Sequence, residues 1–82
     1  MIATDRQVTV LETLLAFLDH SPDSPENQSA YEHIESARTY ALGSMPEEYA
    51  LTLQMAREAI NALPEEDVRR KAQGLLEELF GS

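Results

Sequence analysis

The side chains best suited to chemistry in this chain are two histidines and fifteen acidic residues. Helical bundles that hold a pair of metal ions use a Glu-x-x-His motif, in which both ligands point inward. The residues three positions before His20 and His33 are Phe17 and Ala30, so neither histidine has the partner that this motif needs. The sequence therefore predicts no metal ligands and no cofactor.

The residue patterns of nucleophilic catalysis are missing as well. The chain has no cysteine, no G-x-S-x-G sequence and no glycine-rich loop of the kind that holds phosphate. We also expect a bundle of 82 residues to leave no room for the cleft of about 300 Å³ that small-molecule sites need. These observations predict a protein that is not an enzyme, with no catalytic residues and no small-molecule substrate.

The charge of the chain limits the partners that it can bind. Fifteen acids against six bases give a formal net charge of −9. Contact with a nucleic-acid backbone needs clustered lysine and arginine, so we expect no direct nucleic-acid binding. No apolar run approaches the ~20 residues of a membrane span, and the absence of cysteine fits a reducing compartment. We expect a soluble, cytoplasmic protein.

The elements that would position any binding site are helices, and residues 5–20 show this most clearly. Large apolar side chains recur there at helical spacing and predict one inward stripe, formed by Val8, Leu11, Leu15 and Leu18. A flank beside this stripe consists of Val10, Leu14 and Phe17. Together they cover ~180° of the helix, against the ~100° that a surface helix needs. The pattern predicts that this helix contacts more than one neighbour, within the fold or in another chain.

Prolines and helix caps divide the rest of the chain into three more helices. Ser24 precedes Pro25 as an N-cap, and Ser44 has capping-box spacing to Glu47. Gly43 is expected to end a helix in the left-handed conformation. We predict an all-α fold of one domain, residues 1–82, in which four helices near 5–20, 25–42, 46–62 and 65–80 form a small antiparallel bundle. A core completed by dimerisation is the main variant.

The later helices have inward stripes of their own. The second consists mainly of alanine, at Ala30, Ile34, Ala37 and Ala41. The third consists of Tyr49, Leu53, Ala56 and Ile60, and a second apolar flank on the same helix holds Leu51 and Met55. The fourth consists of Val68, Ala72, Leu75 and Leu79. We expect Leu15 and Leu53 to lie near the centres of their stripes.

Surplus apolar surface predicts a non-enzymatic protein–protein interaction module, such as an adaptor, a docking domain or a small chaperone-like protein. We expect it to bind another protein, itself as a two-fold homodimer, or both. The main interface is assigned to the flank of the first helix, with support from the third. The predicted partner-binding residues are Val10, Leu14, Phe17, Leu51 and Met55.

Two alternatives stay open at the level of sequence. The first is an acidic inhibitor or antitoxin, in which carboxylates imitate nucleic acid and bind a basic partner. Its contact residues would be Glu47, Glu48, Glu65, Glu66 and Asp67. The second is a purely structural homodimer with no other partner. Net charge does not separate these functions, because it also serves solubility.

Overall fold

The computed structural model describes residues 4–80, so residues 1–3 and 81–82 of the predicted domain lie outside the described part. Four helices occupy this range, with no strands among the described residues. Each helix begins and ends within one residue of its predicted bounds. The helices are α1 Asp5–Asp19, α2 Pro25–Leu42, α3 Pro46–Asn61 and α4 Glu66–Phe80. The predicted all-α fold is confirmed.

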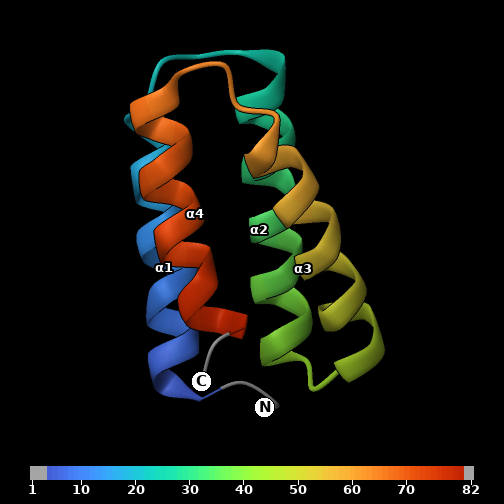
Figure 1. Cartoon of the computed structure of the whole chain (residues 1–82). Coiled ribbons are helices and arrows are strands. Elements are labelled where there is room, and N and C mark those ends of the chain that lie inside the picture. The colour runs from blue at the N-terminus through green and yellow to red at the C-terminus, as the bar shows by residue number, and fades with distance from the viewer. Residues whose placement is uncertain (1–3, 81–82) are drawn as a thin grey trace.

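The helices run in alternating directions and form a four-sided bundle (Figure 1). Contacts join α1 to α2, α2 to α3, α3 to α4, and α4 back to α1, while the diagonal pairs make none within residues 4–80. The closest packing is between α2 and α3. The bundle measures 33 × 20 × 18 Å. None of the described helices is both long enough and apolar enough to cross a membrane.

The first two helices each begin with an N-cap residue whose side chain forms a hydrogen bond. The Thr4 hydroxyl accepts a hydrogen bond from the Gln7 backbone at 3.1 Å, and the Gln7 side chain accepts one from the Thr4 backbone at 2.9 Å. This reciprocal pair is a capping box, which satisfies two otherwise unpaired N–H groups. Ser24 caps α2 as predicted, by accepting a bond from the Asn27 backbone at 3.0 Å.

The turn between α2 and α3 differs from its prediction. Gly43 has a φ of −85°, and the left-handed residue is Ser44, at a φ of 56°. The Met45 N–H donates to the Tyr40 carbonyl at 3.0 Å and the Ser44 N–H to the Ala41 carbonyl at 3.3 Å, which is the Schellman pattern. Because Ser44 takes the left-handed position, Met45 becomes the N-cap of α3 and makes no side-chain bond there. The predicted capping box of Ser44 with Glu47 is therefore wrong.

The inward face of α1 is rotated from the predicted stripe. Val10 and Leu14, which the sequence analysis placed on the flank, are buried, and Leu14 has no exposed surface. Leu11 and Leu18 are buried as predicted, whereas Val8 and Leu15 are only half-buried. The reason is that α1 packs against α2 on one side and α4 on the other, so its whole apolar arc is used inside the chain.

The core combines buried residues from all four helices. In α2 the four predicted positions are all buried, and their small alanine side chains let α3 approach closely. In α4 the fully inward leucine is Leu76 rather than the predicted Leu75, which is half-buried. The core residues are Val10, Leu11, Leu14, Leu18, Ala30, Ile34, Ala37, Ala41, Leu53, Ala56, Ile60, Leu63, Ala72, Leu76 and Leu79.

One polar atom on the inward side of α3 lacks a partner. The ring of Tyr49 is half-buried and packs against the core, and its hydroxyl is buried with no hydrogen bond among the described residues. Burial raises the pKa of Tyr49 above its ordinary value, because desolvation disfavours the charged phenolate.

Candidate functional site

The outer face of α3 carries the most exposed large apolar residue of the described chain, Leu51, at 64 % exposure. Met55, one helical turn further on, is 41 % exposed. Residues four apart lie side by side on a helix, so these two side chains form one small apolar surface, here called the α3 face. At about 100° per residue, Leu51 points ~180° and Met55 ~140° away from the buried Ile60, so the α3 face looks away from the core.

Acids surround the α3 face. Glu47 lies one turn before Leu51, and Glu58 follows Met55 at a spacing of three, so all four share one side of the helix. Both glutamates are exposed, and neither is in an ion pair within residues 4–80. The basic residue of α3, Arg57, bonds Glu77 of α4 at 2.9 Å and lies over the Phe80 ring at 4.3 Å. The α3 face is therefore apolar at its centre and negative at both ends.

The flank of α1 does not form the surface that the sequence predicted. Val10 and Leu14 are core residues, so the expectation that they are exposed is wrong. Phe17 is half-buried against the core, and the Lys71 ammonium of α4 lies 5.6 Å from the centre of its ring. The neighbouring helix thus covers the apolar surface that had been assigned to a partner.

The five acids assigned to the inhibitor alternative do not form a single patch. Glu47 and Glu48 lie at the start of α3, whereas Glu65, Glu66 and Asp67 lie at the start of α4, at the opposite end of the bundle (Figure 1). Glu66 is moreover paired with Arg70 of its own helix at 2.7 Å. The antiparallel arrangement divides the five acids into two distant groups.

Two further exposed apolar side chains, Leu42 and Met45, lie at the turn between α2 and α3. Their exposure is similar to that of Met55. Leu42 is the last residue of α2 and Met45 is the N-cap of α3. This pair provides a matched comparison for the α3 face, since its side chains have the same types and similar exposure.

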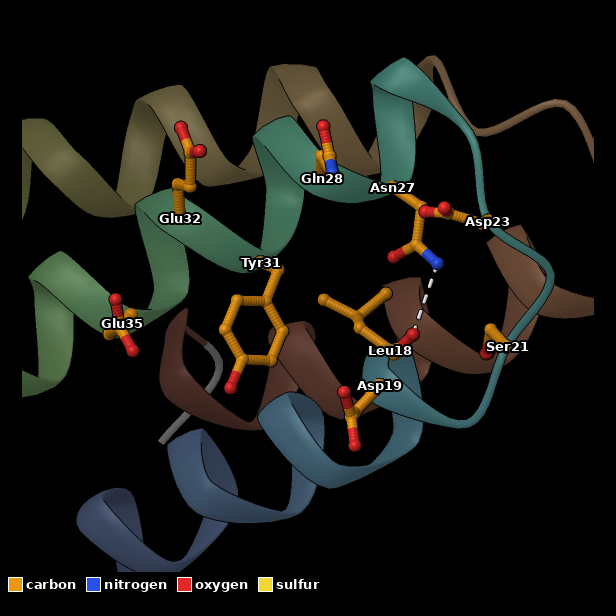
Figure 2. Close-up of a pocket in the computed structure, with 9 residues that line it drawn as sticks. All are labelled: Leu18, Asp19, Ser21, Asp23, Asn27, Gln28, Tyr31, Glu32 and Glu35. Atoms are coloured by element: carbon orange, nitrogen blue, oxygen red, sulfur yellow. Dashed lines mark hydrogen bonds between the residues drawn. The ribbon is translucent and has the colours of Figure 1, made fainter.

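A groove of about 620 Å³, here called the α1–α2 groove, lies where the C-terminal end of α1 meets the first turns of α2 (Figure 2). Leu18, Asn27 and Tyr31 contribute to its wall. A second groove, of about 600 Å³, lies between α1 and α4, and the Arg6–Glu78 ion pair spans these helices at 3.3 Å. The expectation that so small a bundle leaves no room for a cleft is therefore wrong. Surface grooves between neighbouring helices supply the space that the packed core does not.

Asn27 joins the two helices at the α1–α2 groove. Its Nδ2 donates to the carbonyls of Leu18 and Pro22, each at 3.0 Å, so it holds the end of α1 and the connector against α2. The side chain is 5 % exposed, and Oδ1 is buried with no hydrogen-bond partner among the described residues. A buried acceptor left without a donor costs about 1–3 kcal/mol. Figure 2 shows Oδ1 directed towards the space between Leu18 and Tyr31.

The α1–α2 groove is strongly negative. Four exposed carboxylates line it, and no lysine, arginine or histidine does. None of the four is in an ion pair within the described part of the chain. The four are Asp19, Asp23, Glu32 and Glu35.

Side chains for metal chemistry do not converge anywhere in residues 4–80, where no group of three or more potential ligands is close enough to hold an ion. His20, at the end of α1, places its Nδ1 2.8 Å from the Ala16 carbonyl, as expected for an imidazole in a last helical turn. His33 is half-buried on α2.

The α1–α2 groove is the feature that reasoning from the sequence missed. A signal for it was present, because Asn27 continues the inward stripe of α2 at a spacing of three from Ala30. A polar residue at an inward position has to find hydrogen-bond partners, and it therefore marks a place where the core is interrupted.

Comparison of the chain with protein-family models, with curated proteins and with solved structures gave no match.

Proposed function

We propose that this chain is a non-enzymatic protein–protein interaction module that binds its partner through the α3 face, Leu51 and Met55. The observation that carries the proposal is the 64 % exposure of Leu51, on the side of α3 that looks away from the core. No other helix of the bundle can cover this side, since α2 and α4 pack against the inward surfaces of α3. Burying a leucine side chain contributes ~1.5–3 kcal/mol to an association.

The charges around the α3 face indicate what kind of partner it fits. Apolar side chains lie at the centre, and Glu47 and Glu58 lie at the ends, in no ion pair within residues 4–80. The complementary surface is an apolar segment with lysine or arginine on both sides, such as one face of a basic amphipathic helix. We therefore propose a basic segment of another protein as the partner.

A second copy of the chain is a poorer occupant of the same surface. Two-fold pairing would bring the α3 faces of both copies together, with their glutamates close to one another. Each copy also carries a net charge of −9. Like charges held near each other disfavour the complex, so self-association is an outcome to test rather than the proposal.

Among the subclasses, the α3 face favours an adaptor or docking domain. An acidic inhibitor that imitates nucleic acid needs one extended negative surface, and the acids assigned to it lie at opposite ends of the bundle. We keep the cytoplasm as the proposed compartment, because a chain without cysteine needs no oxidising environment to fold.

Affinity capture with matched variants tests the proposal. The immobilised full chain is exposed to an extract of its source cells, and each captured protein is purified and its Kd measured for three forms. These are the wild type, Leu51→Glu, and Leu42→Glu as the control at the turn between α2 and α3. We expect Leu51→Glu to raise the Kd of the purified partner by at least about tenfold, the equivalent of losing ~1.4 kcal/mol of binding free energy. Leu42→Glu should leave this Kd unchanged.

Three results would contradict the proposal. A partner that is lost with Leu42→Glu and kept with Leu51→Glu would place the interface at the turn. A partner without basic residues at its contact segment would remove the argument from charge. Light scattering that gives a dimer of the wild type and a monomer of Leu51→Glu would assign the α3 face to self-association.

A further inference from the structure

The α1–α2 groove contains a hydrogen-bond acceptor that the chain itself does not use. Asn27 is 5 % exposed, and both hydrogen bonds made by its amide come from Nδ2, to Leu18 and Pro22. Its Oδ1 is buried and accepts no bond within the described residues. Figure 2 shows this oxygen next to the Leu18 side chain, with the Tyr31 ring beyond it, and both residues belong to the groove wall. A ligand that completes this arrangement has to donate a hydrogen bond.

The acidic lining of the groove favours a cationic donor. Asp19, Asp23, Glu32 and Glu35 line the groove without a basic residue among its lining. Three glutamates elsewhere in the bundle, Glu12, Glu77 and Glu78, each bond an arginine of a neighbouring helix. The four carboxylates of the groove have no such partner within residues 4–80.

The spacing of these carboxylates distinguishes between kinds of cation. A divalent metal ion needs several oxygen ligands that converge within a few ångströms of one point. No group of three potential ligands within the described residues meets this condition. An extended organic cation, with ammonium groups separated by methylenes, can instead reach carboxylates that are spread along a groove of about 620 Å³. Its methylenes can pack on Leu18 and on the half-buried ring of Tyr31, and an ammonium over that ring is favourable.

We propose that the α1–α2 groove binds an aliphatic polyamine. One ammonium group donates to Asn27 Oδ1, the methylene stem packs against Leu18 and Tyr31, and the remaining ammonium groups pair with the four carboxylates. Less than 1 Å² of Oδ1 is exposed in the free chain, so a side chain of the groove wall has to move when the ligand enters. The proposal is independent of the α3 face, which belongs to another helix and to different residues.

Nuclear magnetic resonance of the full chain, titrated with spermidine, tests the proposal. We expect saturable shifts of the Asn27 side-chain amide and of the Tyr31 ring signals. The paired change Asp19→Asn with Glu35→Gln should raise the Kd by about fivefold, which is the effect of losing exposed charge pairs. The matched control is Glu47→Gln with Glu48→Gln, which removes the same charge at the opposite end of the bundle and should leave the Kd unchanged.

The contact with the aromatic ring needs a separate variant. Asn27→Ala also removes the hydrogen bonds to Leu18 and Pro22 and so destabilises the fold, which makes Tyr31→Leu the better substitution. It keeps an apolar side chain in the groove and removes the ring. We expect Tyr31→Leu to weaken spermidine binding while the circular-dichroism melt stays that of a folded helical protein.

A second probe identifies the source of the ammonium group. Acetyl-lysine methylamide presents the same ammonium group on a protein side chain. Binding of spermidine alone supports a free polyamine, and equal binding of both probes supports the ammonium chemistry with a lysine side chain as its source. Shifts that do not saturate would overturn the proposal. So would an equal rise of the spermidine Kd in the Glu47→Gln, Glu48→Gln control, or the same saturable shifts produced by Mg²⁺.

Discussion

Helices α1 and α3 each carry more large apolar side chains than one inward stripe requires, and these side chains meet different surroundings. In α1 the additional residues Val10 and Leu14 are continuous with the stripe, and the structure buries them between α2 and α4. In α3 the additional residues Leu51 and Met55 lie opposite the stripe, and they remain exposed. The difference shows that the position of surplus apolar residues around a helix matters more than their number. A widened arc indicates neighbours within the fold, whereas a separate second face indicates a surface that the fold leaves uncovered.

The largest effect expected from this comparison is that of Leu14→Ala. Leu14 has no exposed surface, and truncating a buried leucine costs ~2–5 kcal/mol. A domain of this size has ~5 kcal/mol of stability in total, so we expect much of the protein to unfold. A urea titration followed by circular dichroism measures this change. Leu15→Ala, one residue away and half-buried, should cost less. Equal losses at both positions would show that the inward face of α1 is centred elsewhere.

Phe17→Glu should have an intermediate effect. The ring packs against the core and lies near the Lys71 ammonium, so its loss should reduce the free energy of unfolding by ~1.5–3 kcal/mol. A new ion pair between the glutamate and Lys71 offsets part of this loss. If Phe17 were instead the interface residue predicted from the sequence, the substitution would leave stability unchanged and abolish assembly. Urea denaturation together with light scattering separates the two outcomes.

The pH dependence of stability, compared between the wild type and Tyr49→Phe, tests the inward side of α3. The folded state holds the Tyr49 pKa above its ordinary value, so the unfolded chain loses its phenol proton first as the pH rises. The wild type should therefore lose stability as the pH rises from about 10, the pKa of the unfolded chain, to the raised pKa of the folded state. Tyr49→Phe should remove this alkaline loss and leave stability at neutral pH unchanged or higher, because the buried hydroxyl has no partner. Thermal melts at several alkaline pH values measure the effect, and Tyr40→Phe, which retains Tyr49, is the control.

The smallest effect is expected for Leu51→Ala. Leu51 is exposed and looks away from the core, so its truncation should change the free energy of unfolding by no more than ~0.5 kcal/mol. The same urea titration that is used for Leu14→Ala applies here. A loss above ~2 kcal/mol would mean that Leu51 is buried in the free protein, in a dimer or otherwise. In that case the contrast between α1 and α3 would disappear.

The bounds of the helices could be predicted from the sequence because local chemistry determines them. Prolines at 22, 25, 46 and 64 and the caps at Thr4 and Ser24 act within a few residues of themselves. The turn after α2 was predicted less well. Glycine is the usual left-handed residue there. The helix ends at Leu42 as predicted, yet Gly43 has a φ of −85° and Ser44 takes the left-handed conformation.

The candidate sites were only partly accessible to the same reasoning. Leu51 and Met55 were identified, because apolar residues opposite a stripe are visible in the spacing alone. The role of Asn27 was not, because its bonds to Leu18 and Pro22 form only when α1 and α2 come together.

The sequence by itself thus determined four helices, their ends and the residue types of each face, all of which depend on interactions within one or two turns. Tertiary structure alone decided which part of each apolar arc is buried. That choice depends on where neighbouring helices lie, and α1 packs between two of them, so Leu14 rather than Leu15 lies at the centre of its buried face. The separation of the acids at the starts of α3 and α4, in contrast, already followed from the predicted antiparallel bundle, because alternating helix directions place successive N-termini at opposite ends.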